Sequence, residues 1–176
     1  MSSEFERTGA EEVYEGKIFS VWRETFRYVD GEEATREIVR HPGAVGIVAH
    51  DDAVVWLVRQ PREAVGAADL LEIPAGKLDE EGEDPLRTAQ RELAEEVGKT
   101  ADRWEPLHDF FTSPGFADER FFLYLATGLR DHDAEAQENE RIDVVAWPLE
   151  RLDDAIVDCH DSKSLIGLLS LARRLG

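Results

Sequence analysis

The sequence predicts an α+β protein in which helices pack on a mixed β-sheet. Segments typical of strands follow one another along most of the chain, whereas only three segments have the features of helices. Runs of strands with few helices favour a single sheet with helices on its faces. At 176 residues, 42% of them hydrophobic, the chain is long enough for one domain with a packed core, or for one subunit of a dimer.

The N-terminal region is expected to contain antiparallel strands after a short leader. Residues 1–12 are largely polar and acidic, and we expect them to be loose. Residues 17–42 predict two strands joined by a turn at Asp30-Gly31. Residues 43–60 predict a second hairpin that turns at Asp51-Asp52.

The rest of the chain supplies further strands and the two closing helices. Residues 70–74 form a short apolar run that ends at Pro74 and predicts a buried strand. The other strands are expected at 104–114, 120–127 and 142–148, and the closing helices at 148–158 and 162–175.

A helix over residues 85–97 is the most clearly delimited element. Asp84 can cap its N-terminus, Pro85 suits its first position, and Gly98 can end it in a left-handed conformation. The core face of this helix is predicted by apolar side chains at helical spacing: Leu86, Ala89, Leu93 and Val97.

Acidic residues are concentrated in and before this helix. Residues 74–99 hold eight carboxylates against four Arg or Lys, and like charges this close repel. Glu92 and Glu96 are four residues apart and can converge on one point, and carboxylate oxygens are the ligands that hard cations prefer. Arg91 could orient one of the acids. The alternative is a solvated acidic face on a protein that is acidic throughout.

Composition excludes several classes of function. The net charge of −19 and the lack of clustered Lys and Arg argue against a nucleic-acid partner. No apolar run is long enough to span a membrane, so we expect no membrane association. Cys159 is the only cysteine, which excludes an internal disulfide and a cysteine-based zinc site, and a cytoplasmic protein is the simplest expectation.

The acidity is spread along the chain, and only four of the twenty basic residues are lysine. We therefore hypothesise a halophilic, salt-adapted protein, because salt screens the self-repulsion of a highly charged surface.

The spacing of residues in the acidic stretch resembles the signature of the Nudix hydrolases. The matching positions are Gly76, Glu83 and the run Arg91-Glu92-Leu93-x-Glu95-Glu96-x-Gly98. The sequence departs from the signature twice, with six residues where five usually separate Gly76 from Glu83, and with Lys99 where an aliphatic residue is usual. The spacing from Glu83 to Gly98 is intact, so the metal-binding part is expected to be preserved.

This resemblance implies a Nudix fold, an α/β/α sandwich preceded by an N-terminal antiparallel strand region. It also implies a bound Mg²⁺ or Mn²⁺, with Glu95 close to the metal and with Glu83 paired to Arg91 in support. The implied metal ligands are Glu92 and Glu96, the Ala75 carbonyl and, nearby, Glu95.

Several segments outside the signature resemble the ADP-ribose pyrophosphatase subgroup. Pro114 follows Gly98 by sixteen residues, and the similarity extends over roughly residues 13–172. The segments concerned are TREIVRHPGAVGIV, LVRQPREAV, LLEIPAGKLD, TSPGFADERFFLYLATGL and SKSLIGLL. The resemblance implies hydrolysis of ADP-ribose to AMP and ribose 5-phosphate. The alternatives are a Nudix diphosphatase for GDP-mannose, NADH or a similar diphosphate, and a non-catalytic nucleotide sensor.

The subgroup's acidic loop before a late strand corresponds to AQENERIDVV in this chain. Glu140 is where that loop supplies a catalytic base or a metal ligand, and Glu138 is the next candidate. The alternative is an acidic loop without a catalytic role.

Four further residues are candidates for substrate contacts. Arg62 matches an arginine near the diphosphate or the terminal ribose, and a bidentate guanidinium suits that role. Phe19 and Arg36 correspond roughly to positions that sandwich the adenine, although strand packing and a surface charge explain them equally well. Glu72 should point into the site if Leu71 and Ile73 face the core, and could bond the nucleotide or a metal-bound water.

The resemblance also implies a homodimer. Residues 1–42 would form the dimerising strand region and residues 43–176 the hydrolase domain. The leading hairpins would then exchange between subunits, and Phe19 and Arg36 would contribute to the partner's site.

Overall fold

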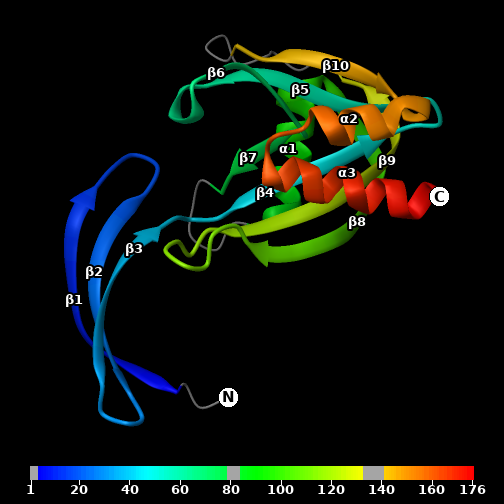
Figure 1. Cartoon of the computed structure of the whole chain (residues 1–176). Coiled ribbons are helices and arrows are strands. Elements are labelled where there is room, and N and C mark those ends of the chain that lie inside the picture. Colours follow the sequence, from blue (N-terminus) through cyan, green and yellow to red (C-terminus); the bar gives the residue numbers. More distant parts are fainter. Residues whose placement is uncertain (1–3, 79–83, 133–140) are drawn as a thin grey trace. The chain divides into compact units, whose positions relative to one another are not determined.

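The computed structural model describes residues 4–78, 84–132 and 141–176. The chain divides into two compact units (Figure 1). The first consists of Met1–Gly43 and Phe111–Arg120, and the second of Ala44–Phe110 and Phe121–Gly176.

The first unit contains a three-stranded antiparallel sheet in the order β1-β2-β3. Its strands are β1 (Phe5–Glu15), β2 (Ser20–Tyr28) and β3 (Glu33–Arg40). The turn between β2 and β3 is the predicted one, with Gly31 at a φ of 88° and with the Glu32 N–H bonded to Asp30 Oδ1 at 3.0 Å.

The expectation of a loose leader over residues 1–12 was wrong for residues 5–12, because β1 is paired with β2 from Phe5 opposite Tyr28 to Glu15 opposite Ser20. Every residue of β1 is exposed, its backbone is paired with β2, and its sequence lacks the apolar alternation that predicts a strand.

The second unit is built on a seven-stranded mixed sheet. Its central order is β10-β5-β4-β9-β8, with β6 paired to β5 and β7 paired to β4. The β4–β9 pair is parallel, and the β4–β7, β4–β5, β5–β6 and β5–β10 pairs are antiparallel. The strands are β4 (Ala44–His50), β5 (Val54–Arg62), β6 (Ala67–Glu72), β7 (Ala75–Lys77), β8 (Lys99–Phe111), β9 (Arg120–Asp131) and β10 (Asp143–Pro148).

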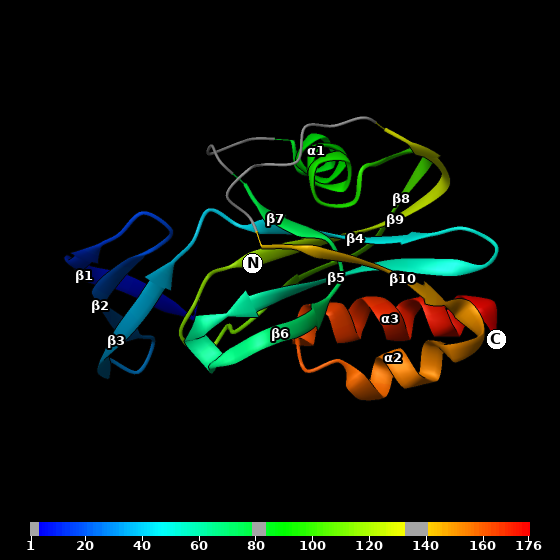
Figure 2. The same ribbon diagram turned by 90° about the horizontal axis from the view of Figure 1, so that it is seen from above.

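Helices cover both faces of this sheet, as Figure 2 shows. One face packs on α1 (Pro85–Val97), and the other packs on α2 (Leu152–Asp158) and α3 (Ser162–Leu175). Short 3₁₀ turns, η1 (Glu63–Val65) and η2 (Leu149–Arg151), follow β5 and β10. The predicted α+β fold with a sheet between helices is confirmed.

The α1 helix begins and ends as its sequence predicts. The Asp84 side chain accepts a hydrogen bond from Leu86 N at 3.0 Å, and Gly98 ends the helix with a φ of 68°. Ala89, Leu93 and Val97 are buried against β4 and β5. The segment 148–158, expected as one helix, is instead the end of β10, then η2, then α2.

Lys99, the departure from the signature after Gly98, is accommodated by a cation–π contact and an ion pair. Its Nζ lies 4.2 Å from the ring centroid of Trp56 and 2.7 Å from Asp131 Oδ1. The bonded ammonium lowers the pKa of the Asp131 carboxyl. The lysine side chain is only 13% exposed, so its aliphatic stem fills the place of an aliphatic residue.

Leu93 is completely buried between α1 and the sheet, so Leu93→Ala should lower the free energy of unfolding by about 2–5 kcal/mol. Leu169→Ala is the matched control, because Leu169 is also helical but 49% exposed, and it should change stability by roughly 0.5 kcal/mol or less. Urea unfolding followed by circular dichroism measures both, and equal losses would contradict the assigned packing.

Candidate functional site: an acidic helix against a short strand

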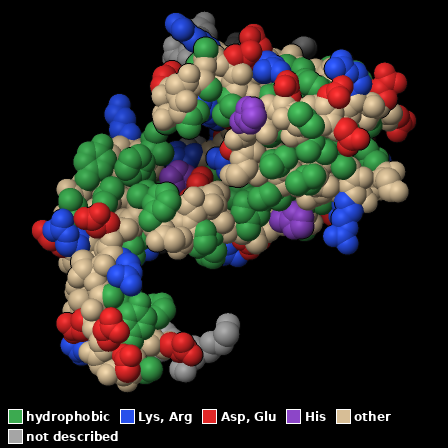
Figure 3. Space-filling view, in the orientation of Figure 1, with side chains coloured by type: hydrophobic (Ala, Val, Ile, Leu, Met, Phe, Trp, Pro, Cys, Tyr) green, Lys and Arg blue, Asp and Glu red, His purple; other side chains and the backbone are tan. Residues whose placement is uncertain are grey.

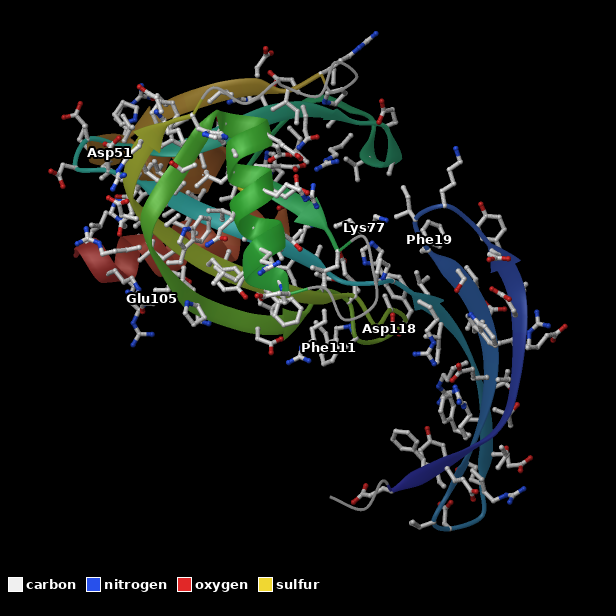
Figure 4. The ribbon with its side chains drawn as sticks, turned by 180° about the vertical axis from the view of Figure 1, so that it is seen from behind. Phe19, Asp51, Lys77, Glu105, Phe111 and Asp118 are labelled. Carbon is white, nitrogen blue, oxygen red and sulfur yellow. The ribbon has the colours of Figure 1, made fainter. Side chains whose placement is uncertain are left out.

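The acidic side of α1 faces strand β7. The backbone N–H of Ala75 donates a hydrogen bond to Glu96 Oε2 at 3.0 Å. Glu92 lies against Gly76 so closely that a Cβ added to this glycine would be 2.0 Å from Glu92 Cδ. In Figure 4, α1 lies in front of the sheet and the labelled Lys77 marks the end of β7. The two glutamates predicted as metal ligands therefore meet neighbouring residues of one strand.

The position of β7 is fixed by the sheet. Ala75 is opposite Gly46 of β4, and Gly76 is opposite Val45. β4 is buried along most of its length and lies between β5 and β9 at the centre of the sheet. The strand that approaches Glu92 and Glu96 is thus anchored to the most buried part of the second unit.

Arg91 holds two of the neighbouring acids. Its Nη1 lies 2.9 Å from Glu92 Oε1 and 3.1 Å from Glu95 Oε2. This cation offsets the repulsion between the carboxylates. Glu83, the expected partner of Arg91, lies outside the described residues, as do the predicted catalytic acids Glu138 and Glu140.

The donor chemistry of this site fits a hard divalent cation, since Glu92 and Glu96 present carboxylate oxygens beside the backbone of β7. Within residues 4–78, 84–132 and 141–176, no three His, Cys, Asp or Glu side chains are placed so that they could hold a metal ion. The described residues therefore contribute a pair of carboxylates rather than a complete ligand set.

A partly buried ion pair lies on strands β5 and β6. Arg62 binds Glu72 side-on, with Nε to Oε1 at 2.8 Å and Nη2 to Oε2 at 2.6 Å. The Glu72 side chain is 6% exposed and that of Arg62 is 41% exposed. Glu72 raises the pKa of Arg62, partial burial opposes this, and Glu96 and Asp161 add smaller increases. Arg62 therefore lies within the electrostatic influence of the α1 acids.

The orientation expected for Glu72 follows the alternation of strand β6. Leu71 and Ile73 pack into the core beneath α2 and α3. Glu72 is paired with Val58, whose side chain belongs to the core beneath α1. Glu72 thus points to the α1 side of the sheet, although its carboxylate is engaged by Arg62.

Phe19 and Arg36, expected to sandwich a base, are not brought together within the first unit. Arg36 is opposite Glu24 on the neighbouring strand, and Phe19 precedes Glu24 by about 16 Å of extended chain. Arg36 lines a cavity of about 300 Å³ whose other lining residues include Phe26 and Tyr28. Phe19 is 42% exposed. A shared role for the two residues stays a prediction that involves two subunits.

Sequence reasoning missed the role of Ser164, which is 1% exposed. Its Oγ accepts a hydrogen bond from Ile73 N at 2.9 Å and donates one to Asp161 Oδ2 at 2.7 Å. The Asp161 side chain also caps α3 by accepting from Ser164 N. This network joins the start of α3 to the residue after Glu72. The Asp-x-x-Ser spacing predicts the cap, but no local signal predicts the bond to Ile73.

Comparison with known proteins agrees with the signature and the fold. The family model described as NUDIX domain matches residues 40–164. The chain therefore belongs to the NUDIX family, whose hydrolases use a divalent metal ion.

Three characterised relatives cover most of this chain. An ADP-ribose pyrophosphatase of Mycobacterium tuberculosis is 45% identical over 82% of this chain and 70% of its own length. An ADP-ribose pyrophosphatase of Bacillus subtilis is 41% identical over 85% of this chain and 82% of its own length. The methanol dehydrogenase activator of Bacillus methanolicus is 39% identical over 90% of this chain and 87% of its own length.

A solved structure supports the fold assignment. The crystal structure of an ADP compounds hydrolase superimposes with a TM-score of 0.85, covering 98% of this chain and 95% of its own, at 23% sequence identity. In the described part of this chain, no helix has the length and apolarity needed to cross a membrane.

Gly76→Ala should displace Glu92, because the added Cβ overlaps its carboxylate group. We expect divalent-cation affinity and metal-dependent activity to fall by roughly 10–100-fold, as for other changes that misplace a metal ligand. Gly9→Ala is the control, since its Cβ would meet only Thr25 at an ordinary 3.7 Å. Titration calorimetry with Mn²⁺ measures the affinity, and an unchanged value in Gly76→Ala would show that this close approach does not position a ligand.

Proposed function

We propose that this protein hydrolyses the diphosphate of ADP-ribose, giving AMP and ribose 5-phosphate. The close approach of Glu92 and Glu96 to strand β7 supports the hydrolytic chemistry. The substrate is suggested by two relatives, 45% and 41% identical, that are ADP-ribose pyrophosphatases.

We propose Mg²⁺, with Mn²⁺ as a substitute, as the metal ion. Its ligands would be the carboxylates of Glu92 and Glu96 and the carbonyl oxygen of Ala75, with Glu95 nearby. A bound divalent cation neutralises charge on the diphosphate and activates water. Arg91 would keep Glu92 and Glu95 in place through the ion pairs described above.

The remaining roles belong to residues that contact the substrate or move a proton. Arg62 would bind a phosphate oxygen, since part of its guanidinium is exposed. Glu140 would be the general base or a further metal ligand, with Glu138 as the second candidate. Glu83 would support Arg91. Phe19 and Arg36 would contact the adenine across a dimer.

The homodimer is proposed on the surface of the first unit. Among the described residues, eight of the thirteen exposed large hydrophobic side chains belong to this unit, including Phe5, Val13 and Ile18. Hydrophobic side chains are visible on the three-stranded sheet in Figure 3. A concentration of exposed apolar side chains on one unit favours an interaction site there.

Light scattering should give a mass of twice the 19.9 kDa chain. Val13→Asp combined with Ile18→Asp should lower that mass, because buried charge opposes association. Val157→Asp is the control, since Val157 is 80% exposed but belongs to the second unit. A wild-type mass of one chain would exclude the dimer.

Glu96→Gln should reduce AMP formation from ADP-ribose by at least about 100-fold, because even residues that only orient a metal ligand cost roughly 10–100-fold. Glu150→Gln, an exposed acid in η2, should retain activity. The assay follows AMP by chromatography with Mg²⁺ at low and molar KCl, and compares ADP-ribose with GDP-mannose, NADH and a nucleoside triphosphate.

Preference for another diphosphate would overturn the substrate while leaving the family intact. Binding of ADP-ribose without turnover of any compound would favour the nucleotide sensor instead.

A further inference from the structure

Glu72 is a buried acid that is not among the proposed metal ligands, so its role has to be explained in another way. It lies on β6, and its carboxylate accepts two short hydrogen bonds from Arg62 and a longer one, 3.4 Å, from Gln60 Nε2. Both oxygens are therefore engaged, and the side chain is 6% exposed. A carboxylate in this state has little capacity to bond a substrate hydroxyl or a metal-bound water.

The geometry of the pair leaves one edge of the Arg62 guanidinium available. Glu72 occupies the edge formed by Nε and Nη2. One N–H of Nη1 and the second N–H of Nη2 form the end-on edge, which has the spacing to bind a phosphate bidentately. The described residues offer no further hydrogen-bond partner to Arg62, whose side chain is 41% exposed.

The backbone explains how Arg62 reaches Glu72. Strand pairing runs from Val58 opposite Glu72 to Gln60 opposite Leu70, and then shifts before Arg62 meets Ala67. Pro61 lies at this irregularity and has no N–H to donate to the ladder, as is usual where a strand bulges. Val58, Gln60 and Arg62 alternate to one face of β5, and Glu72, opposite Val58, lies on that same face, so the Arg62 guanidinium can reach its carboxylate.

Other acids compete for this guanidinium. After Glu72, the charges that act most on Arg62 are those of Glu96 and Asp161. Glu96 is a proposed metal ligand, and an arginine bound to it would oppose a cation there. Asp161 already caps α3 through Ser164. The bidentate bond to Glu72 is the contact that fixes the orientation of the Arg62 guanidinium.

We infer that Glu72 is a positioning residue: it holds the edge of Arg62 formed by Nε and Nη2, and so presents the free edge of the guanidinium to a phosphate oxygen of the substrate. This inference rests on the proposed diphosphate hydrolysis. It assigns Glu72 no direct contact with the nucleotide or with metal-bound water.

A double-mutant cycle tests the assignment with the full-length enzyme. Glu72→Gln and Arg62→Gln should each raise KM for ADP-ribose roughly 10–100-fold, the range expected when hydrogen bonds to a charged group are lost. The combined variant should be no worse than Arg62→Gln alone, since Glu72 acts only through Arg62. It also carries no unpaired buried charge, which guards against a folding defect.

Glu105→Gln is the matched control. It removes the acid from an exposed Arg–Glu pair in which Arg174 Nη2 lies 2.5 Å from Glu105 Oε1, and it should leave KM unchanged. If the increases in KM of the two single variants multiply in the combined variant, Glu72 contacts the substrate itself and the inference is overturned. A raised Mg²⁺ requirement in Glu72→Gln with unchanged KM would overturn it in favour of a role at the metal.

A second measurement is independent of activity. The ¹⁵N-detected Nε–H signal of Arg62, assigned by its loss in Arg62→Gln, should exchange slowly with solvent in the wild type and rapidly in Glu72→Gln. Fast exchange in the wild type would overturn the inference even if ADP-ribose is hydrolysed. If another diphosphate proves to be the substrate, the proposed function fails while the same cycle, run with that compound, still decides the role of Glu72.

Discussion

The contact of helix α1 with strand β7 at Gly76 is the constraint on which the rest of the site depends. The Glu92 carboxylate packs on backbone where any β-carbon would overlap it, and Glu96 accepts a hydrogen bond from the preceding residue, Ala75. Since β7 is paired with the buried strand β4, the acids are placed by the sheet. On a solvated helix face of the same composition, no neighbouring strand would hold the carboxylates in place.

The charges around this contact are arranged in neutralising pairs. Arg91 is engaged by Glu92 and Glu95, and Arg62 by Glu72. The protein as a whole carries a net charge of −19. Because each guanidinium is already paired with an acid, these pairs add no net positive charge to meet an incoming diphosphate, even though one edge of Arg62 can still donate hydrogen bonds to it. Added divalent cations supply that compensation, which is consistent with the metal use of the family.

Much of the second unit could be predicted from local signals, whereas the supporting contacts could not. The limits of α1 follow from Asp84 and Gly98, whose preferences are intrinsic to those residue types. Strand β1 was missed because it is exposed and held by its backbone. The bond from Ile73 to Ser164 joins residues far apart in the sequence, and the Arg62–Glu72 pair depends on how strand β5 pairs with strand β6. Spacing along a chain predicts elements, but it does not predict which elements meet.

Lys99 shows how a departure from a family signature can preserve the packing that the signature encodes. Its side chain is mostly buried, with the ammonium over the Trp56 ring and bonded to Asp131 at the end of β9. Positions 99 and 131 are therefore linked in this chain: an aliphatic residue at 99 would leave Asp131 without its cation. A search pattern that demands an aliphatic residue after the glycine would reject a sequence that meets the same packing requirement by other means.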